Sequence, residues 1–422
     1  METISVLTMK TLPIACLAVL TAMVPVHAQT TREITDARLR EAIEGYWIGQ
    51  LAGNYLGLPF ENLYKDEPMP ILVDRYYTFK DAEPLGLMMN LDDRRAYLPI
   101  LADALGGAWS DDDSDIEFVY LHTVEQHGLE PTYEQITDAW RTHINRFIWG
   151  ANRRARDAMD EGHIAPATGA KENNREWYRI SSQLTTEIWG IFHPGLTERG
   201  GEWAQKISRV ATDDWATHPD LFFGTLFSAA YFESDTTKLV ELGRRALPED
   251  SPFREGIDDL VRWRAEFSDW RDARSRLHEK YYREIRGFVV PDPVAGSIIN
   301  ALAAVLALLY GENDWMKTVS ISISAGYDCD NQAATCGALL AMIHGAKVIP
   351  ERITHELPSR NRWRSPFNNT YINYSRDGLP AFNRNSDIID RIKAVTEKSI
   401  LLNGGERLDS PTGPAYRLLS DF

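Results

Sequence analysis

Apolar side chains recur at helical spacing along nearly the whole chain, and this pattern restricts the fold more than any other feature of the sequence. No run of alternating β-branched residues competes with it, so we predict an all-α protein. Hydrophobic residues make up 44% of the 422 residues, which is enough for a large buried core. The pattern predicts helices over residues 34–57, 115–127, 132–160, 179–192, 200–211, 221–232, 236–246, 253–283, 295–310, 313–325, 331–345 and 386–402.

Three segments interrupt the helical pattern and predict long surface connections. Residues 62–108, 162–178 and 351–385 are rich in proline, asparagine, glycine and charge. Connections of that length in a compact domain tend to carry function. Because we find no internal repeat and no low-complexity linker, we expect one α-helical domain over residues 29–350. Residues 351–422 would then form a C-terminal extension that packs on the same domain.

The first 28 residues have the features of a signal peptide. Lys10 precedes an apolar stretch, and Val26, His27 and Ala28 fit a small-residue cleavage site. The apolar stretch is interrupted by prolines and is short for a membrane span. We therefore expect cleavage near Ala28 and a secreted or periplasmic protein that has no contact with a membrane after cleavage.

Two cysteines, Cys329 and Cys336, remain after that cleavage. Seven residues apart on one predicted helix, they stand about 10 Å apart, which is too far for a disulfide. We expect both to be small buried hydrophobic residues.

The charge of the chain excludes one class of partner. A formal net charge of −16 and a pI near 5.1 argue against nucleic-acid binding, because that binding uses a basic face to neutralise phosphates. An anionic substrate would therefore need a local cation to hold it.

Residues 108–122, AWSDDDSDIEFVYLH, place four aspartates within five positions, immediately ahead of an apolar helical pattern. Carboxylates that close repel one another, and the repulsion usually persists only where a cation or solvent offsets it. A helix start tolerates one or two acids as caps and first-turn residues, but four exceed that need. The segment is either a solvated acidic loop or part of a metal site.

A second acidic segment resembles the first. Residues 324–345, SAGYDCDNQAATCGALLAMIHG, bring Asp328, Asp330 and Asn331 together at the start of a helix rich in small residues. Mg²⁺, Mn²⁺ and Ca²⁺ take oxygen ligands, and two such segments supply enough oxygens for a pair of ions. The two segments together favour a metal site over a solvated surface.

Four ordered segments resemble the ADP-ribosylglycohydrolase family, which implies an all-α, compact orthogonal multi-helix bundle with a binuclear metal centre. Residues 45–61, GYWIGQLAGNYLGLPFE, are similar to the family's N-terminal G-x-x-x-G-D-x-x-G-x-P-x-E segment. The first acidic segment stands in place of the T-D-D-T motif. Residues 183–195, QLTTEIWGIFHPG, look like the mid-chain segment that ends in a Pro-Gly turn. Residues 299–350 follow the final motif closely.

The resemblance also implies roles for individual residues. The apolar Ile116 and Phe118 place Ser114 on the last Thr of T-D-D-T, so Asp111 replaces a metal-binding Thr. Asn54 replaces the Asp of the G-D pair, and Asn331 stands where the family often has Thr. The implied metal ligands are Asp111, Asp112, Asp113, Asp328, Asp330 and Asn331. The implied catalytic carboxylates are Glu61, Asp112 and Asp113, and the implied substrate contacts are Asn54, Gly326 and Tyr327.

The implied reaction is hydrolysis of an N- or O-glycosidic bond to ribose, with two divalent cations, Mg²⁺ first and Mn²⁺ or Ca²⁺ as alternatives. ADP-ribosyl conjugates, small or protein-linked, are the expected substrates, and another ribosyl or glycosyl compound is an alternative. A secreted protein that binds ADP-ribose or a glycoside without turnover is a further alternative. A terpenoid synthase also has a D-D-x-x-D motif, but its second motif fails at Asn313 and Asp314. The sequence leaves the oligomeric state open.

Aromatic and histidine residues near these segments are weaker candidates. Some tryptophans there are candidates for stacking on a base or sugar, although most of the 12 in the chain are expected in the core. His218 is expected to be a structural histidine. The tryptophans near the motif segments are Trp47, Trp109, Trp149, Trp177 and Trp189.

Overall fold

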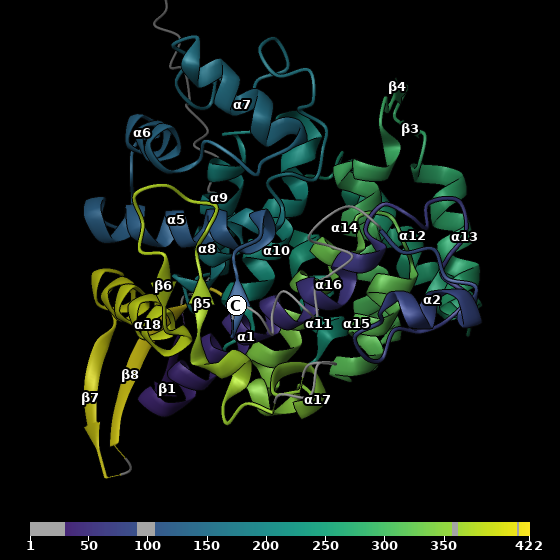
Figure 1. The fold of residues 1–422 in the computed structure, drawn as a ribbon. Coiled ribbons are helices and arrows are strands. Elements are labelled where there is room, and N and C mark those ends of the chain that lie inside the picture. The colour runs from purple at the N-terminus through teal and green to yellow at the C-terminus, as the bar shows by residue number, and fades with distance from the viewer. Residues whose placement is uncertain (1–29, 91–105, 357–361, 412) are drawn as a thin grey trace, which may run out of the picture.

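The computed structural model describes residues 30–90, 106–356, 362–411 and 413–422, and these are predominantly helical (Figure 1). The prediction of an all-α fold class is confirmed. Helices α1 (Asp36–Gly57), α14 (Ser297–Tyr310) and α16 (Cys329–His344) lie in the middle of the view, and the other helices surround them. Every residue of α14 is buried, as expected for a central helix that is apolar all round.

The pair α1 and α16 positions the site. A stripe of glycines, Gly45, Gly49, Gly53 and Gly57, recurs every four residues on α1 and faces α16. A Cβ atom added at Gly53 would lie 2.0 Å from the carbonyl oxygen of Ala333, so only glycine permits this approach. Gly57 lies against the backbone of Asp330. This register places the end of α1 beside the beginning of α16, where the second acidic segment lies.

The surrounding helices follow the predicted pattern, with three differences. The predicted helix over 179–192 is only a 3₁₀ turn, Leu184–Thr186, followed by the short helix Ile188–Ile191. The predicted helix over 132–160 is two helices, because Phe147 and Gly150 have positive φ angles of 51° and 49° between them. The predicted helix over 253–283 is also two, because Phe267 is extended and Asp269 caps the second. The helices around the central three are α5 (Asp112–His127), α6 (Tyr133–His143), α7 (Gly150–Asp160), α8 (Ile188–Ile191), α9 (Thr197–Ser208), α10 (His218–Ala229), α11 (Thr236–Ala246), α12 (Pro252–Glu266), α13 (Trp270–Tyr281), α15 (Trp315–Ser324) and α18 (Asn385–Leu402). The short helices α2 (Phe79–Leu85) and α17 (Glu351–Thr354) lie within predicted connections.

Small sheets join distant parts of the chain, and the sequence pattern did not predict them. Strand β1 (Thr30–Thr35) pairs antiparallel with β8 (Gly413–Ser420), which pairs with β7 (Glu406–Ser410). Strand β2 (Ala108–Trp109) pairs with β5 (Tyr371–Ile372), and β5 pairs with β6 (Phe382–Asn383). A two-stranded hairpin joins β3 (Glu284–Ile285) to β4 (Phe288–Val289). Residues after 350 therefore contact the N-terminal strand and the segment that leads into α5.

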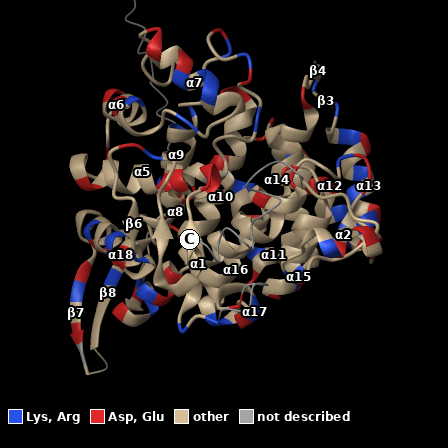
Figure 2. Ribbon diagram, in the orientation of Figure 1, with Lys and Arg blue, Asp and Glu red and all other residues tan. Residues whose placement is uncertain are grey.

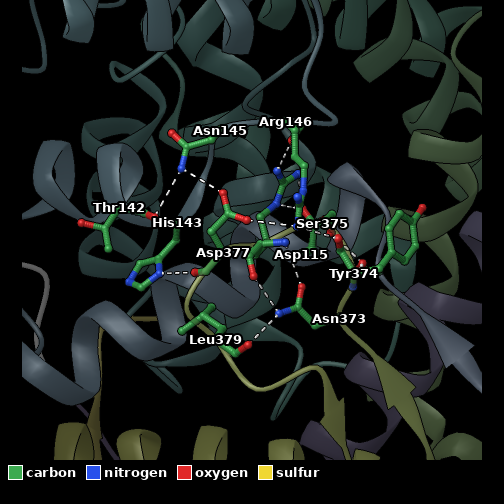
Figure 3. A network of polar contacts seen from close by, with 12 residues as sticks. Asp115, Thr142, His143, Asn145, Arg146, Asn373, Tyr374, Ser375, Asp377 and Leu379 are labelled. Atoms are coloured by element: carbon green, nitrogen blue, oxygen red, sulfur yellow. Dashed lines mark hydrogen bonds and ion pairs between the residues drawn. The ribbon is translucent and has the colours of Figure 1, made fainter.

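A buried ion pair fixes the start of α5 against the segment after β5 (Figure 3). Arg376 Nε donates to Asp115 Oδ1 at 2.6 Å, and both side chains are fully buried. Ser375 donates to the other oxygen of Asp115. Asp377 extends the network, because its carbonyl oxygen lies 2.7 Å from Nδ1 of His143 on α6. The first turn of α5 is thereby held by a segment more than 250 residues away.

Two further expectations concern cysteines and membrane contact. Cys329 and Cys336 are free and buried, as predicted. Within the described residues, no helix has both the length and the apolar character needed to cross a membrane. The expected signal peptide, residues 1–28, lies outside the described residues.

Candidate active site

A cavity of about 300 Å³ opens where α1, α5 and α16 meet. Figure 2 shows acidic segments gathering near the centre of the view, at the end of α5 that faces the middle of the molecule. The two acidic segments, far apart in sequence, thus line one cavity. Glu61, which follows the turn after α1, lines it as well. The described lining residues are Glu61, Asn62, Asp112, Asp113, Trp149, Gly150, Asn152, Arg179, Ile180, Ser181, Thr185, Ala295, Asp328, Asp330 and Asn331.

The carboxylates form two overlapping groups. Oxygens of Glu61, Asp328 and Asp330 lie within 4.8 Å of one another, and so do oxygens of Asp111, Asp113 and Asp330. Asp330 belongs to both groups and is 2% exposed. Two sets of three carboxylates that share one member match the ligand pattern of two neighbouring divalent cations.

Helix starts bring these acids together. Asp111 is the N-cap of α5, and Asp112 and Asp113 occupy its first turn. Asp328 is the N-cap of α16, and Asp330 lies in its first turn. The partial positive charge of the two helix N-termini stabilises these carboxylates to some degree, so part of the acid clustering is a property of the helices themselves.

Two amides hold the carboxylate of Asp113. Asn54 Nδ2 donates to Asp113 Oδ2 at 3.2 Å, and Asn331 Nδ2 donates to Asp113 Oδ1 at 3.2 Å. Burial, followed by the charges of Asp330, Asp112, Asp111 and Asp328, raises the pKa of Asp113 well above its usual value. A bound cation would oppose that shift, because it favours the charged carboxylate.

The residues fit a pair of hard cations. All the side chains that converge here offer oxygen, and Oδ1 of Asn331 is buried without a hydrogen-bond partner among the described residues. The acids whose positions fit ligation are Glu61, Asp111, Asp113, Asp328 and Asp330. Asp112 lines the cavity but belongs to neither group of three.

The three predicted substrate contacts lie outside the described lining of this cavity. Asn54 is fully buried beneath Asp113 and does not line the cavity. The Tyr327 ring is also fully buried, where its hydroxyl lies 3.1 Å from Nδ1 of His278 and Arg274 stacks on its face. Gly326 has φ of +86°, and a Cβ atom there would lie 1.7 Å from the carbonyl oxygen of Tyr64. All three residues therefore lie beside the cavity and not in its described lining.

The opposite wall of the cavity was largely missed by the sequence analysis. It comprises Trp149, Gly150 and Asn152 at the start of α7 together with Ser181 and Thr185. Of the five tryptophans considered, Trp149 alone is exposed, at 48%, while Trp47, Trp109, Trp177 and Trp189 are buried. His218 does not line the cavity, and its Nδ1 lies 2.8 Å from the Ser251 hydroxyl, as expected of a structural histidine.

Arg179 is the one lysine or arginine among the described lining residues. Its Nε donates to Glu176 at 2.7 Å and its Nη2 donates to Asp292 at 2.6 Å. Its charge is therefore balanced by two carboxylates at the cavity edge.

The comparisons with known proteins agree with this architecture. The family model for ADP-ribosylglycohydrolase matches residues 35–377. No curated protein matches the sequence. A solved structure titled "ADP-ribosylglycohydrolase-related protein complex" is 15% identical, with a TM-score of 0.50, and the match covers 86% of this chain and 99% of that chain. At that identity the structural likeness concerns the fold alone, but the family model spans well over half of the sequence, and the chain therefore belongs to the ADP-ribosylglycohydrolase family.

Proposed function

We propose that this protein is a metal-dependent hydrolase that cleaves an N- or O-glycosidic bond to ribose. Family membership supports glycohydrolase activity. The metal dependence is supported chiefly by the two groups of carboxylates that share Asp330 beside the cavity. ADP-ribosyl conjugates are the first substrates to test, because the family is named for them.

The residues divide into ligands and proton-transfer groups. Asp111, Asp113 and Asp330 would hold one divalent cation, and Glu61, Asp328 and Asp330 the other. When bound, the cations would supply positive charge that orients ribose hydroxyls and favours an ionised water.

Asp112 is the carboxylate that lines the cavity outside both groups, so we assign it the transfer of a proton between water and the glycosidic bond. Glu61 is the second candidate for this step, since it also lines the cavity. Asp113 is held by two amides and is suited to ligation instead.

The opposite wall supplies groups that suit a sugar. Ser181 and Thr185 carry hydroxyls, and Asn152 carries an amide whose Oδ1 is buried without a partner among the described residues. The exposed ring of Trp149 offers a flat apolar face on which a base or sugar can stack. This wall would fix the ring that bears the scissile bond.

A binding protein without turnover is the second candidate. It is favoured by Asn54 and Asn331, which occupy positions where the resemblance implies Asp and Thr and which both hold Asp113. Such a protein would retain cation and ligand binding but release no product.

The first experiment is calorimetric titration of the metal-stripped mature protein with Mg²⁺, Mn²⁺ and Ca²⁺, followed by ADP-ribose with and without the preferred ion. The same samples are then assayed for release of ribosyl products from ADP-ribosylated peptide and from simple ribosides. Two-ion binding with product release supports the hydrolase. Ligand binding without product supports the binding protein, and failure to bind any divalent cation contradicts the proposal.

The proposal also includes export, based on residues 1–28. Expression of the full chain in a bacterial host, followed by fractionation and mass determination, tests it. A mature chain beginning near Gln29 in the periplasm or medium is expected, and an uncleaved cytosolic chain would contradict it.

A further inference from the structure

A second group of buried polar side chains lies behind the cavity wall. Glu117 on α5 is fully buried, and its Oε1 accepts the backbone N–H of Ile188 at 2.7 Å. Its Oε2 accepts Nε2 of Gln50 at 2.7 Å and the hydroxyl of Tyr46. Helices α1, α5 and α8 therefore meet at a carboxylate that receives three hydrogen bonds.

Beside Glu117 lie polar atoms that the described residues do not satisfy. They are Oε1 of Gln50, both amide atoms of Gln183, both carboxylate oxygens of Glu187 and the Thr335 hydroxyl. Each of these side chains is at most 1% exposed. Buried polar atoms without partners are costly, and a group of them in a native core indicates a bound water or ion.

These side chains come from segments that contact one another. Glu187 directly precedes Ile188, whose N–H is bonded to Glu117, and the charge of Glu117 acts on Glu187. Thr335 on α16 lies close enough to oppose the burial-induced rise in the pKa of Glu187, although it does not complete a hydrogen bond. Gln183 and Glu187 flank the 3₁₀ turn Leu184–Thr186, and this turn contacts both α5 and α16.

We propose that Gln50, Gln183, Glu187 and Thr335 bind a monovalent alkali cation, Na⁺ or K⁺, in the core. The group offers amide, hydroxyl and carboxylate oxygens, which are ligands for hard cations. Glu117 is already hydrogen-bonded by three donors, which leaves the carboxylate of Glu187 to be balanced. A cation held by Glu187 would also offset the repulsion from the neighbouring Glu117 carboxylate.

The cation would support the wall of the proposed active site. Thr185 lies between Gln183 and Glu187 in the chain and lines the cavity. Fixing Gln183 and Glu187 therefore fixes the backbone that presents Thr185. The site itself does not depend on the proposed hydrolysis, because its occupancy is measurable through stability.

The test is thermal unfolding of the mature chain, with its divalent cations kept, in NaCl, KCl or choline chloride at equal ionic strength. We expect a saturable rise in the unfolding temperature on the order of several °C in NaCl or KCl relative to choline chloride. The same rise in all three salts, or none, would overturn the proposal.

Two variants and one control make the test specific. Glu187→Gln and Thr335→Val should each abolish the difference between the alkali salt and choline, and the second serves if the first does not fold. Asp259→Asn is the control, because Asp259 is also buried but accepts hydrogen bonds from Lys280 at 2.6 Å and Tyr281 at 2.7 Å. It should keep the wild-type response, and an unchanged response in both site variants would contradict the proposal.

The position of the ion is tested by diffraction from crystals grown with Rb⁺ or Tl⁺. An anomalous peak surrounded by oxygens of Gln183, Glu187 and Thr335 is expected. An ordered water at this place, without anomalous signal, would overturn the assignment.

Discussion

Asp113 and Asp115 lie two residues apart in the first turns of α5, and the protein balances their charges in opposite ways. Asp115 is fully buried and paired with the guanidinium of Arg376 at 2.6 Å. Burial still raises its pKa, to about 6, although Arg376 opposes the shift. Asp113, in contrast, accepts hydrogen bonds from two asparagine amides. The charges of four further aspartates repel it.

The difference follows from helix geometry. Residues two apart on a helix point in nearly opposite directions, so Asp115 faces the segment after β5 while Asp113 faces the cavity. One carboxylate is neutralised within the chain and stabilises the fold. The other is assembled with its neighbours at a cost in stability, which is typical of a site built for an external ligand.

The largest expected effect comes from removing the shared carboxylate. Asp330→Asn should lower metal-dependent turnover by at least about 1,000-fold, because both carboxylate groups lose a member. Calorimetry should show loss of divalent-cation binding, while the stripped variant should be at least as stable as the stripped wild type, since repulsion falls. Asp377→Asn, an acid in the Asp115 network, is the matched control and should remain active. Full activity in Asp330→Asn would remove the basis of the account.

The second effect concerns the internally balanced acid. Arg376→Met leaves Asp115 buried without its cation, and we expect a loss of about 3–5 kcal/mol in the free energy of unfolding, measured by urea denaturation. Adding Asp115→Asn to that variant should recover part of the loss. A loss under about 1 kcal/mol in the single variant would show that this pair does not hold the start of α5.

The pH dependence of stability sharpens the same comparison. Burial raises the pKa of Asp220 to about 8, although hydrogen bonds from the Thr186 hydroxyl, a backbone N–H and the Ser182 hydroxyl oppose that rise. Between about pH 4 and 8 the folded chain therefore holds a proton that the unfolded chain has lost, so the free energy of unfolding falls as pH rises. Asp115 contributes to the same fall in the free energy of unfolding, but its contribution should end near pH 6, where its raised pKa lies.

Asp220→Asn should reduce the fall in the free energy of unfolding between pH 6 and 8. The reduction should be on the order of a few kcal/mol, because one pKa unit corresponds to about 1.4 kcal/mol. Urea denaturation at pH 6 and pH 8 measures the change. A variant with the wild-type slope would show that Asp220 ionises normally in the fold.

The smallest effect is expected at the cavity mouth. Trp149→Ala should raise KM about 3- to 10-fold with little change in kcat, because stacking contributes about 0.5–1.5 kcal/mol to binding. Trp149→Phe should recover most of the affinity. A fall in kcat at constant KM would place this ring in the chemical step instead.

The sequence predicted those parts of the fold and site that depend on local pattern. The apolar spacing on α1 and α16 identified both helices, and the clustered aspartates identified both helix starts as one oxygen-rich site. These signals lie within short segments, where helix phase and charge repulsion are readable.

Features that depend on distant contacts were not predictable. Strand β1 pairs with β8 across most of the chain, and Arg376 reaches Asp115 from a segment that reads as a polar connection. The wall that carries Trp149 and Thr185 has no charge cluster to mark it. The buried positions of Asn54, Gly326 and Tyr327 beside the cavity were not predictable either, because motif positions do not reveal how a residue is oriented.

The most direct test of the central claim is anomalous diffraction from crystals of the mature protein grown with Mn²⁺. The account predicts two peaks, one among Asp111, Asp113 and Asp330 and one among Glu61, Asp328 and Asp330, with the Asp330 carboxylate contacting both. Well-ordered carboxylates without a peak between them, at saturating Mn²⁺, would contradict it.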